Sequence, residues 1–293
     1  MKVFYLVGDS RSGSTLLQHL LALQEGVHAL GEVRRMGAMA QSGEPCACGE
    51  TLLACPYWTQ IAKDLGVEVE QIVTEIPREK ENWRGGFFRE IASLKMGRLS
   101  PPGLQPRSAR AVADQCAGIY RATSEKSGDG VLVDSSKDPD HFLHLMARLP
   151  GLIKPVFLLR DGRGIVWSRM QRAGVEVDQA INGFLWMCRL ISWARRAVPA
   201  SARLDVRYED VCQDPEAEVA RILEESGVLK GDVLVDLKRL PKERHDLGGS
   251  PSFLKKRPSK IALDERWRTE MPSADLEVFE RRAGMVNRAL GYS

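Results

Sequence analysis

The sequence predicts an α/β fold in which helices cover both faces of a parallel sheet. The first observation is an apolar run at residues 3–7, followed by a glycine-bearing loop and an amphipathic segment. The second is that further apolar runs of strand length follow at 130–134, 154–160 and 202–207. The third is that helical patterns come between or after these runs, at 139–149, 164–173, 178–197, 215–226 and 272–290. Such alternation is typical of a parallel sheet, here of about four or five strands, whose ligands lie at the carboxyl ends of the strands.

Length, composition and charge narrow the class of protein. The 293 residues are 43% hydrophobic and carry a formal net charge of +3, so one domain spanning residues 1–293 can bury a large core. The low net charge does not favour nucleic acid as a partner. No apolar run approaches the ~20 residues of a membrane span, and polar residues interrupt the apolar start too early for a signal peptide. We therefore expect a cytoplasmic protein that does not insert into a membrane; the oligomeric state is not readable.

Residues 36–127 are predicted to be a helical insertion that covers the site. From 58 to 127 the pattern indicates about two or three helices, interrupted by a Pro/Gly/Ser-rich break at 99–106, and it gives no strand signal. We therefore read it as part of the same domain.

Three cysteines lie close together at the start of this insertion. Cys46, Cys48 and Cys55 lack the paired C-x-x-C spacing of a zinc site, and the preferred interpretation is thiols in a surface turn. A metal would need a fourth ligand from elsewhere in the chain, and Cys116 or a histidine can supply it.

The loop after the first predicted strand has the pattern of a phosphate-binding loop. Gly8 is followed by four residues, then Gly13, Ser14 and Thr15 at the start of a helix. Backbone N–H groups at such a helix start point at an anion, and the helix dipole favours negative charge there. A Walker A loop would have lysine where Ser14 stands, whereas this loop carries its cation at Arg11. The pattern therefore indicates a phosphate-like ligand without the lysine of nucleotide triphosphatases.

A second motif lies at residues 154–172. Arg160 ends an apolar run, and Ser168 and Arg172 follow in a predicted helix, where their i, i+4 spacing puts them on one face. Two guanidinium groups around a hydroxyl suit a phosphate monoester. Alternatively, these arginines only pair with Asp161 and with solvated carboxylates.

Taken together, the loop and the second motif resemble those of the sulfotransferases that use 3′-phosphoadenosine 5′-phosphosulfate (PAPS). The resemblance is closer to the tyrosylprotein and bacterial small-molecule branches than to the cytosolic aryl branch. It implies that the loop holds the 5′-phosphosulfate through Arg11, Ser12, Gly13, Ser14 and Thr15. It also implies that Arg160 and Ser168 hold the ribose 3′-phosphate, and the helical spacing adds Arg172 to this group.

Further positions extend the resemblance. The steps Gly31-Glu32 and Lys137-Asp138-Pro139 match those of the tyrosylprotein branch, and the Tyr-Glu-Asp step puts Tyr208 near the adenine. Residues 245–267 resemble the C-terminal loop that closes over the nucleotide in bacterial members. From this loop the resemblance implies donor contacts by Ser250, Lys255, Lys256 and Arg257, and His245 is a candidate contact for donor or acceptor.

The resemblance assigns chemistry to three catalytic residues. Arg11 and Lys137 are placed to stabilise charge on the transferring sulfuryl group, and Glu32 to take the proton of the attacking hydroxyl. No metal is expected. Judged without the family, Glu32 is more readily an ordinary ion-pairing residue than a base, and His141 and His144 are rival bases.

The sequence therefore predicts transfer of a sulfuryl group from PAPS to a hydroxyl of a small molecule, which is a metabolite, a lipid or a sugar. The other product is adenosine 3′,5′-bisphosphate. Two alternatives remain at this point: a small-molecule kinase with a phosphate-binding loop, and a non-catalytic protein that binds the bisphosphate nucleotide.

Overall fold

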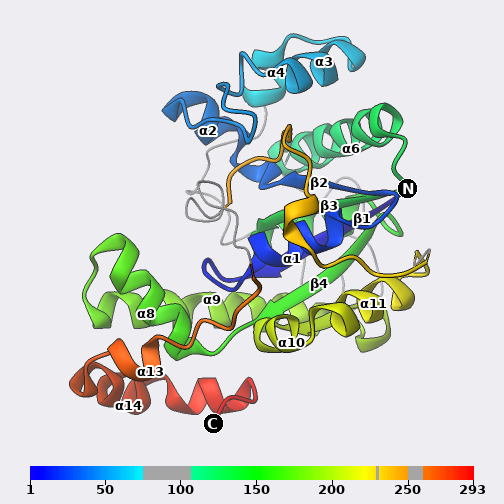
Figure 1. Ribbon diagram of the computed structural model, residues 1–293. Coiled ribbons are helices and arrows are strands. Elements are labelled where there is room, and N and C mark those ends of the chain that lie inside the picture. The colour runs from blue at the N-terminus through cyan, green and yellow to red at the C-terminus, as the bar shows by residue number, and fades with distance from the viewer. Residues whose placement is uncertain (75–106, 229–230, 250–259) are drawn as a thin grey trace.

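A five-stranded parallel sheet forms the centre of the computed structural model, which describes residues 1–74, 107–228, 231–249 and 260–293 (Figure 1). The strands are β1 (Lys2–Gly8), β2 (Val27–Gly31), β3 (Val131–Lys137), β4 (Ile153–Leu159) and β5 (Leu204–Arg207). Their order in the sheet is β2-β3-β1-β4-β5, and every pairing is parallel. The predicted α/β fold is confirmed. Strand β2 is not among the strands predicted from the sequence.

Helices occupy the connections between the strands, close to the predicted ranges. Between β1 and β3 along the chain, the helices are α1 (Ser14–Ala22), η1 (Val33–Arg35), α2 (Met36–Ser42), α3 (Pro56–Asp64), α4 (Val69–Thr74) and α6 (Arg107–Ser127). After β3 they are α7 (Pro139–Arg148), α8 (Gly162–Ala173), α9 (Val177–Ala197), η2 (Ala200–Ala202), α10 (Tyr208–Gln213), α11 (Pro215–Glu225), η3 (Leu237–Arg239), α13 (Trp267–Glu270) and α14 (Ser273–Ala289).

Carboxylates cap two of the helices that follow strands. Asp138 accepts hydrogen bonds from the backbone N–H groups of Asp140 and His141, and Pro139 occupies the first turn of α7, where proline costs no hydrogen bond. Asp161 accepts from the N–H of Arg163 in the same way at the start of α8. These caps fix where each strand ends and its helix begins, and so position the residues between them.

Alternation along β1 sends side chains to two cores, one on each face of the sheet. Val3, Tyr5 and Val7 belong to the core that also holds buried residues of α6, α7 and α9. Phe4 and Leu6 belong to the core that holds buried residues of α1 and α11. The sheet therefore lies between two helical layers, as Figure 1 shows. A third cluster joins α8, α9, α13 and α14 beyond the β4 side.

The described part of the predicted insertion consists of helices joined by turns. Within 36–74 and 107–127 the chain forms α2, α3, α4 and α6, and the β-bridge there is an isolated one, Pro45 to Thr51. Trp58 and Ile61 of α3 pack in the same core as Tyr5 of the central strand. The break at 99–106 lies outside the described residues. Among the described helices, none combines the length and the apolarity needed to cross a membrane.

Candidate active site

Each strand of the sheet delivers a predicted site residue at its carboxyl end. The glycine-bearing loop follows β1, Glu32 follows β2, Lys137 ends β3, Arg160 follows β4 and Tyr208 follows β5. Because all five strands are parallel, these ends lie along one edge of the sheet, toward the left of Figure 1. The candidate residues are thus spread along the edge in the order of the strands.

The loop after β1 is a tight turn held by unusual backbone angles. Arg11 and Gly13 have φ of 75° and 94°, and the N–H of Ser12 donates to the carbonyl of Asp9 at 3.2 Å. Glycine is required at position 13 for a second reason, since a Cβ there would overlap the ring of Tyr208. The first turn of α1, which begins at Ser14, therefore opens directly beside Tyr208.

Long-range contacts bring the loop and the second motif together. The Nε of Arg11 donates to the Oγ of Ser168 at 2.9 Å, and the Nη1 of Arg160 donates to the carbonyl of Arg11 at 2.8 Å. The guanidinium of Arg160 also lies over the ring of Tyr208, 4.3 Å from its centroid. Four predicted donor-binding residues thus form one connected group. The alternative pairing of these arginines with Asp161 is realised instead by Arg163.

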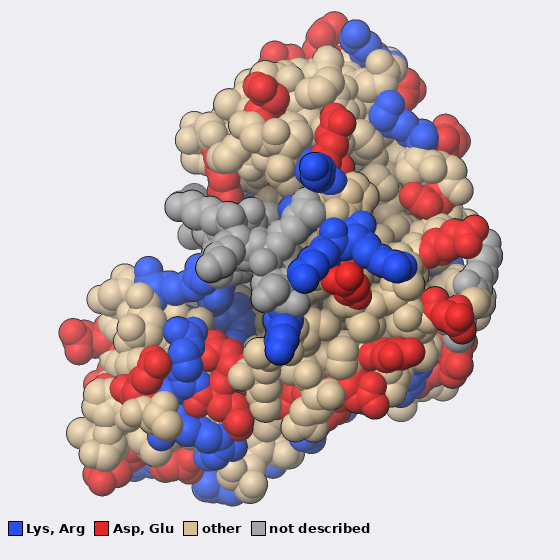
Figure 2. Space-filling view, in the orientation of Figure 1, with Lys and Arg blue, Asp and Glu red and all other residues tan. Residues whose placement is uncertain are grey.

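Positive charge is concentrated in this group. Burial, together with the nearby guanidinium groups of Arg172 and Arg160, lowers the pKa of Arg11 to about 10. Mutual repulsion of this kind is relieved when an anion binds. Asp264 is the carboxylate that faces the group, with its Oδ2 3.4 Å from Nη2 of Arg160. Figure 2 shows Lys and Arg side chains gathered on the left of the same view, beside the carboxyl edge of the sheet.

Glu32 and Lys137 form a second group at the β2–β3 end of the edge. The Nζ of Lys137 lies 2.5 Å from Oε1 of Glu32, and the Nη1 of Arg35 lies 3.7 Å from Oε2. The backbone N–H of Gly249 donates to Oε1 at 3.1 Å. Glu32 is only 7% exposed, so its carboxylate is held by cations and an N–H donor within a largely dehydrated site. The contact with Arg35 agrees with the expectation that Glu32 forms an ordinary ion pair, whereas the contact with Gly249 is not predicted from the sequence.

The two rival bases are buried in the core. The ring of His141 contacts the hydroxyl of Tyr5 at 2.9 Å and the thiol of Cys116 at 3.6 Å, one through each nitrogen. Burial and the charge of Arg34 hold its pKa well below the usual range. His144 is 4% exposed, and burial lowers its pKa to about 4. Both histidines are therefore neutral near pH 7 but enclosed, which favours Glu32 as the base.

Other predicted positions fall elsewhere. Ser250, Lys255, Lys256 and Arg257 lie outside the described residues. His245 does not point at the donor group; its Nδ1 lies 3.3 Å from the sulfur of Cys55. The sequence offers Cys116 or a histidine as a fourth metal ligand beside the three cysteines. In the structure, the side chain that lies next to the cysteines is that of His245, not that of Cys116.

Comparison with known proteins settles the family. Residues 4–229 match the model of the sulfotransferase family. This chain belongs to that family. It is therefore a transferase, and its family implies PAPS as the sulfuryl donor. No curated protein sequence matches the chain.

Solved structures of sulfotransferase domains share the fold. The sulfotransferase domain of the olefin synthase of Synechococcus PCC 7002 is 21% identical, with a TM-score of 0.59 over 100% of this chain and 94% of that one. The sulfotransferase domain of the curacin biosynthetic pathway is 14% identical, with a TM-score of 0.52 over 100% and 98%. At these identities the likeness concerns the fold, and the roles of individual residues must be argued from the geometry above.

Proposed function

We propose that this sulfotransferase transfers the sulfuryl group of PAPS to the hydroxyl of a small-molecule acceptor at the carboxyl edge of its sheet. The donor side of the site is the group around Arg11, Arg160, Ser168, Arg172 and Tyr208. The acceptor side is the group of Glu32 and Lys137. The acceptor is a metabolite, a lipid or a sugar.

The observation that carries the proposal is the distribution of charge along the sheet edge. At the β1–β4–β5 end, Arg11 has two arginine neighbours that lower its pKa, as a site for a multiply charged nucleotide requires. At the β2–β3 end, a buried carboxylate is available as a base. A donor with an anionic nucleotide and an acceptor with a neutral hydroxyl match these two ends.

The chemistry is an in-line displacement at sulfur. The acceptor oxygen forms a bond to sulfur while its proton passes to the carboxylate of Glu32. The bond between sulfur and the bridging oxygen breaks, and its electron pair stays on the 5′-phosphate of adenosine 3′,5′-bisphosphate. Arg11 and the N–H groups at the start of α1 stabilise that leaving oxygen, and Lys137 stabilises the equatorial oxygens of the sulfuryl group. No step requires a metal ion.

The first experiment is thermal unfolding with adenosine 3′,5′-bisphosphate, with ADP and with ATP–Mg²⁺. A ligand at ~100 times its Kd adds about 2.7 kcal/mol, which raises the Tm of a chain of this size by several degrees. We expect a shift with the bisphosphate and little with the other two. A shift with ATP–Mg²⁺ alone would contradict the proposal and favour a kinase.

Turnover separates the enzyme from a binding protein. With PAPS present, acceptors carrying hydroxyl groups are screened for release of the bisphosphate, and mass spectrometry of the product should show one added SO₃ group. Tight nucleotide binding without release of the bisphosphate from any acceptor class would favour a non-catalytic binding protein.

A further inference from the structure

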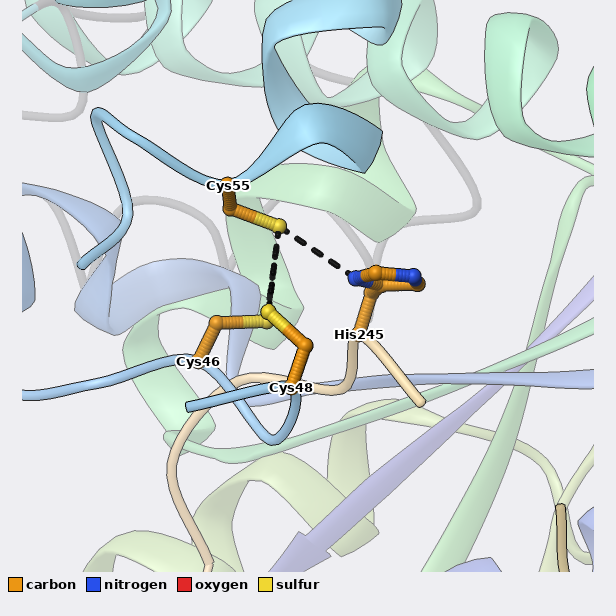
Figure 3. A group of neighbouring side chains, drawn as sticks. All are labelled: Cys46, Cys48, Cys55 and His245. Atoms are coloured by element: carbon orange, nitrogen blue, oxygen red, sulfur yellow. Dashed lines mark hydrogen bonds between the residues drawn. The ribbon is translucent and has the colours of Figure 1, made fainter. Parts of the chain in front are cut away.

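Four metal-ligating side chains meet beside the acceptor side of the site. They are Cys46, Cys48, Cys55 and His245, and one ligand atom of each lies within 4.8 Å of all the others. The sulfur of Cys55 is 3.7 Å from each of the other two sulfurs and 3.3 Å from Nδ1 of His245. Figure 3 shows the three cysteines, from residues 46–55, and His245, from a distant part of the chain, pointing toward one another.

These distances match a tetrahedral metal site. Zinc bonds of ~2.3 Å to sulfur and ~2.0 Å to nitrogen, at tetrahedral angles, place two sulfurs ~3.8 Å apart and a sulfur ~3.5 Å from the nitrogen. A disulfide would need ~2.05 Å between two sulfurs, and it would leave the third thiol without a role. Three sulfurs and one imidazole form a donor set that selects zinc over magnesium or calcium.

The backbone presents the cysteines as a rigid scaffold. The N–H of Gly49 donates to the carbonyl of Cys46 at 2.9 Å, in a tight turn that Gly49 enters at a φ of 98°. The bridge from Pro45 to Thr51 closes the base of this turn. Cys55 stands at the start of α3, directly before Pro56, so its position is fixed by the helix. Two ligands thus come from one turn and the third from a helix end.

Neighbouring groups orient the imidazole as well. The ring of His245 stacks on Tyr57, with centroids 4.8 Å apart and planes at 8°. Its Nε2 lies 3.6 Å from Oε1 of Glu243, and its carbonyl accepts from the Nε1 of Trp58 at 2.9 Å. A carboxylate on the far nitrogen is the usual partner of a metal-bound histidine, because it fixes the tautomer and the ring. Cys46 and Cys55 are buried, whereas Cys48 and His245 are partly exposed.

We propose that Cys46, Cys48, Cys55 and His245 bind one structural zinc ion. Binding exchanges the protons of three thiols for the metal, so that Zn²⁺ and three thiols give a complex of three thiolates and a neutral imidazole, with release of three protons. Four protein ligands leave no open position, so the ion is not a catalyst. Sulfuryl transfer is still expected to need no metal. The proposal does, however, replace the interpretation of these cysteines as thiols in a surface turn.

The ion would tie the insertion to the acceptor side of the site. Leu247, two residues after His245, donates to the carbonyl of Leu30 at 2.9 Å and accepts from the N–H of Glu32 at 2.7 Å. Two residues further, Gly249 donates to the carboxylate of Glu32. The metal thereby anchors the segment that positions Glu32; this consequence, unlike the metal site itself, rests on the proposed function.

Metal analysis tests the site directly. Untagged protein, purified without chelator, should contain about one zinc ion per chain by elemental mass spectrometry. C48S should reduce this content at least several-fold, whereas C116S should keep it, because Cys116 contacts His141 and not the cluster. Absence of zinc from the wild-type protein, an equal loss in C116S, or a disulfide among the three cysteines would overturn the proposal.

Cobalt substitution keeps the test valid if C48S does not fold. Wild-type protein stripped with a chelator and reloaded with Co²⁺ should show the visible absorption of tetrahedral cobalt with thiolate ligands, and Zn²⁺ should displace it. An octahedral spectrum would exclude the site. Neither readout depends on PAPS, so a zinc-loaded protein without sulfuryl transfer would contradict the proposed function alone.

Discussion

The donor and acceptor sides of the site differ in how their charges are balanced. On the donor side, Arg11 is surrounded by guanidinium groups that lower its pKa, and Asp264 faces them. On the acceptor side, Glu32 already has Lys137 and Arg35 as partners. We therefore expect the proposed donor side to be completed by its ligand, and the proposed acceptor side to be organised before a ligand binds. Substitutions on the two sides should fail in different ways, in binding on one and in rate on the other.

Removing the base should have the largest effect and should leave donor binding intact. E32Q keeps the shape of the side chain but cannot take a proton, so we expect kcat to fall by ~10²–10⁴-fold. The matched control is E44Q, since Glu44 also pairs with Arg35, at 2.5 Å, but is less buried than Glu32 and does not contact Lys137. If E32Q has the same kcat as E44Q, the base is another residue. Adenosine 3′,5′-bisphosphate should raise the Tm of the two variants by the same amount.

The link between the acceptor side and the zinc cluster can be broken at a glycine. Gly31 has a φ of 80°, and a Cβ there would overlap the backbone of Leu247. G31A should therefore lower the free energy of unfolding by about 3 kcal/mol, from overpacking and a left-handed backbone together. Its control is G43A, where φ is 68° but no atom lies near the added Cβ, so that only about 1 kcal/mol is expected. Urea denaturation measures both. Equal losses would show that Leu247 moves aside easily.

On the donor side, R160A should weaken the binding of adenosine 3′,5′-bisphosphate by roughly 30-fold, about 2 kcal/mol, as expected for a charge-assisted contact. R163A is the control, because Arg163 lies three residues further along the chain and is paired with Asp161. Titration calorimetry gives both constants. If R160A and R163A bind equally well, the 3′-phosphate is held elsewhere. Saturating nucleotide should restore most of the rate of R160A, which separates it from E32Q.

The residues of the proposed donor side could be picked out from the sequence because their motifs are contiguous, and the structure brings them together. The turn at Gly13 and the spacing of Arg160, Ser168 and Arg172 are visible within short segments that follow apolar runs. Strand β2 was missed, because its five residues include the polar His28 and end in Gly31. Apolar alternation is too brief there to identify a strand.

The zinc cluster and the surroundings of Glu32 were beyond such reading. Cys55 and His245 are 190 residues apart, and Gly249 is 217 residues from Glu32. Both contacts depend on the bridge between Leu247 and Gly31 of β2, which no local sequence pattern predicts. The cysteine spacing was visible, but the identity of the fourth ligand is a property of the tertiary fold.

Histidine titration gives the smallest effect and sharpens the choice of base. His144 has an ordinary pKa in the unfolded chain, near 6.5, and about 4 in the folded protein. As pH falls from 6.5 toward 4, the unfolded state takes up a proton that the folded state does not, so stability is lost over this range. At pH 5 the loss from this residue should be about 2 kcal/mol relative to pH 7. H144Q should lose less stability than the wild type between these pH values in urea denaturation, and its kcat should be nearly unchanged. A large fall in kcat without this gain in acid stability would mean that the ring reaches the substrate, and the acceptor side would then be organised around a histidine instead of Glu32.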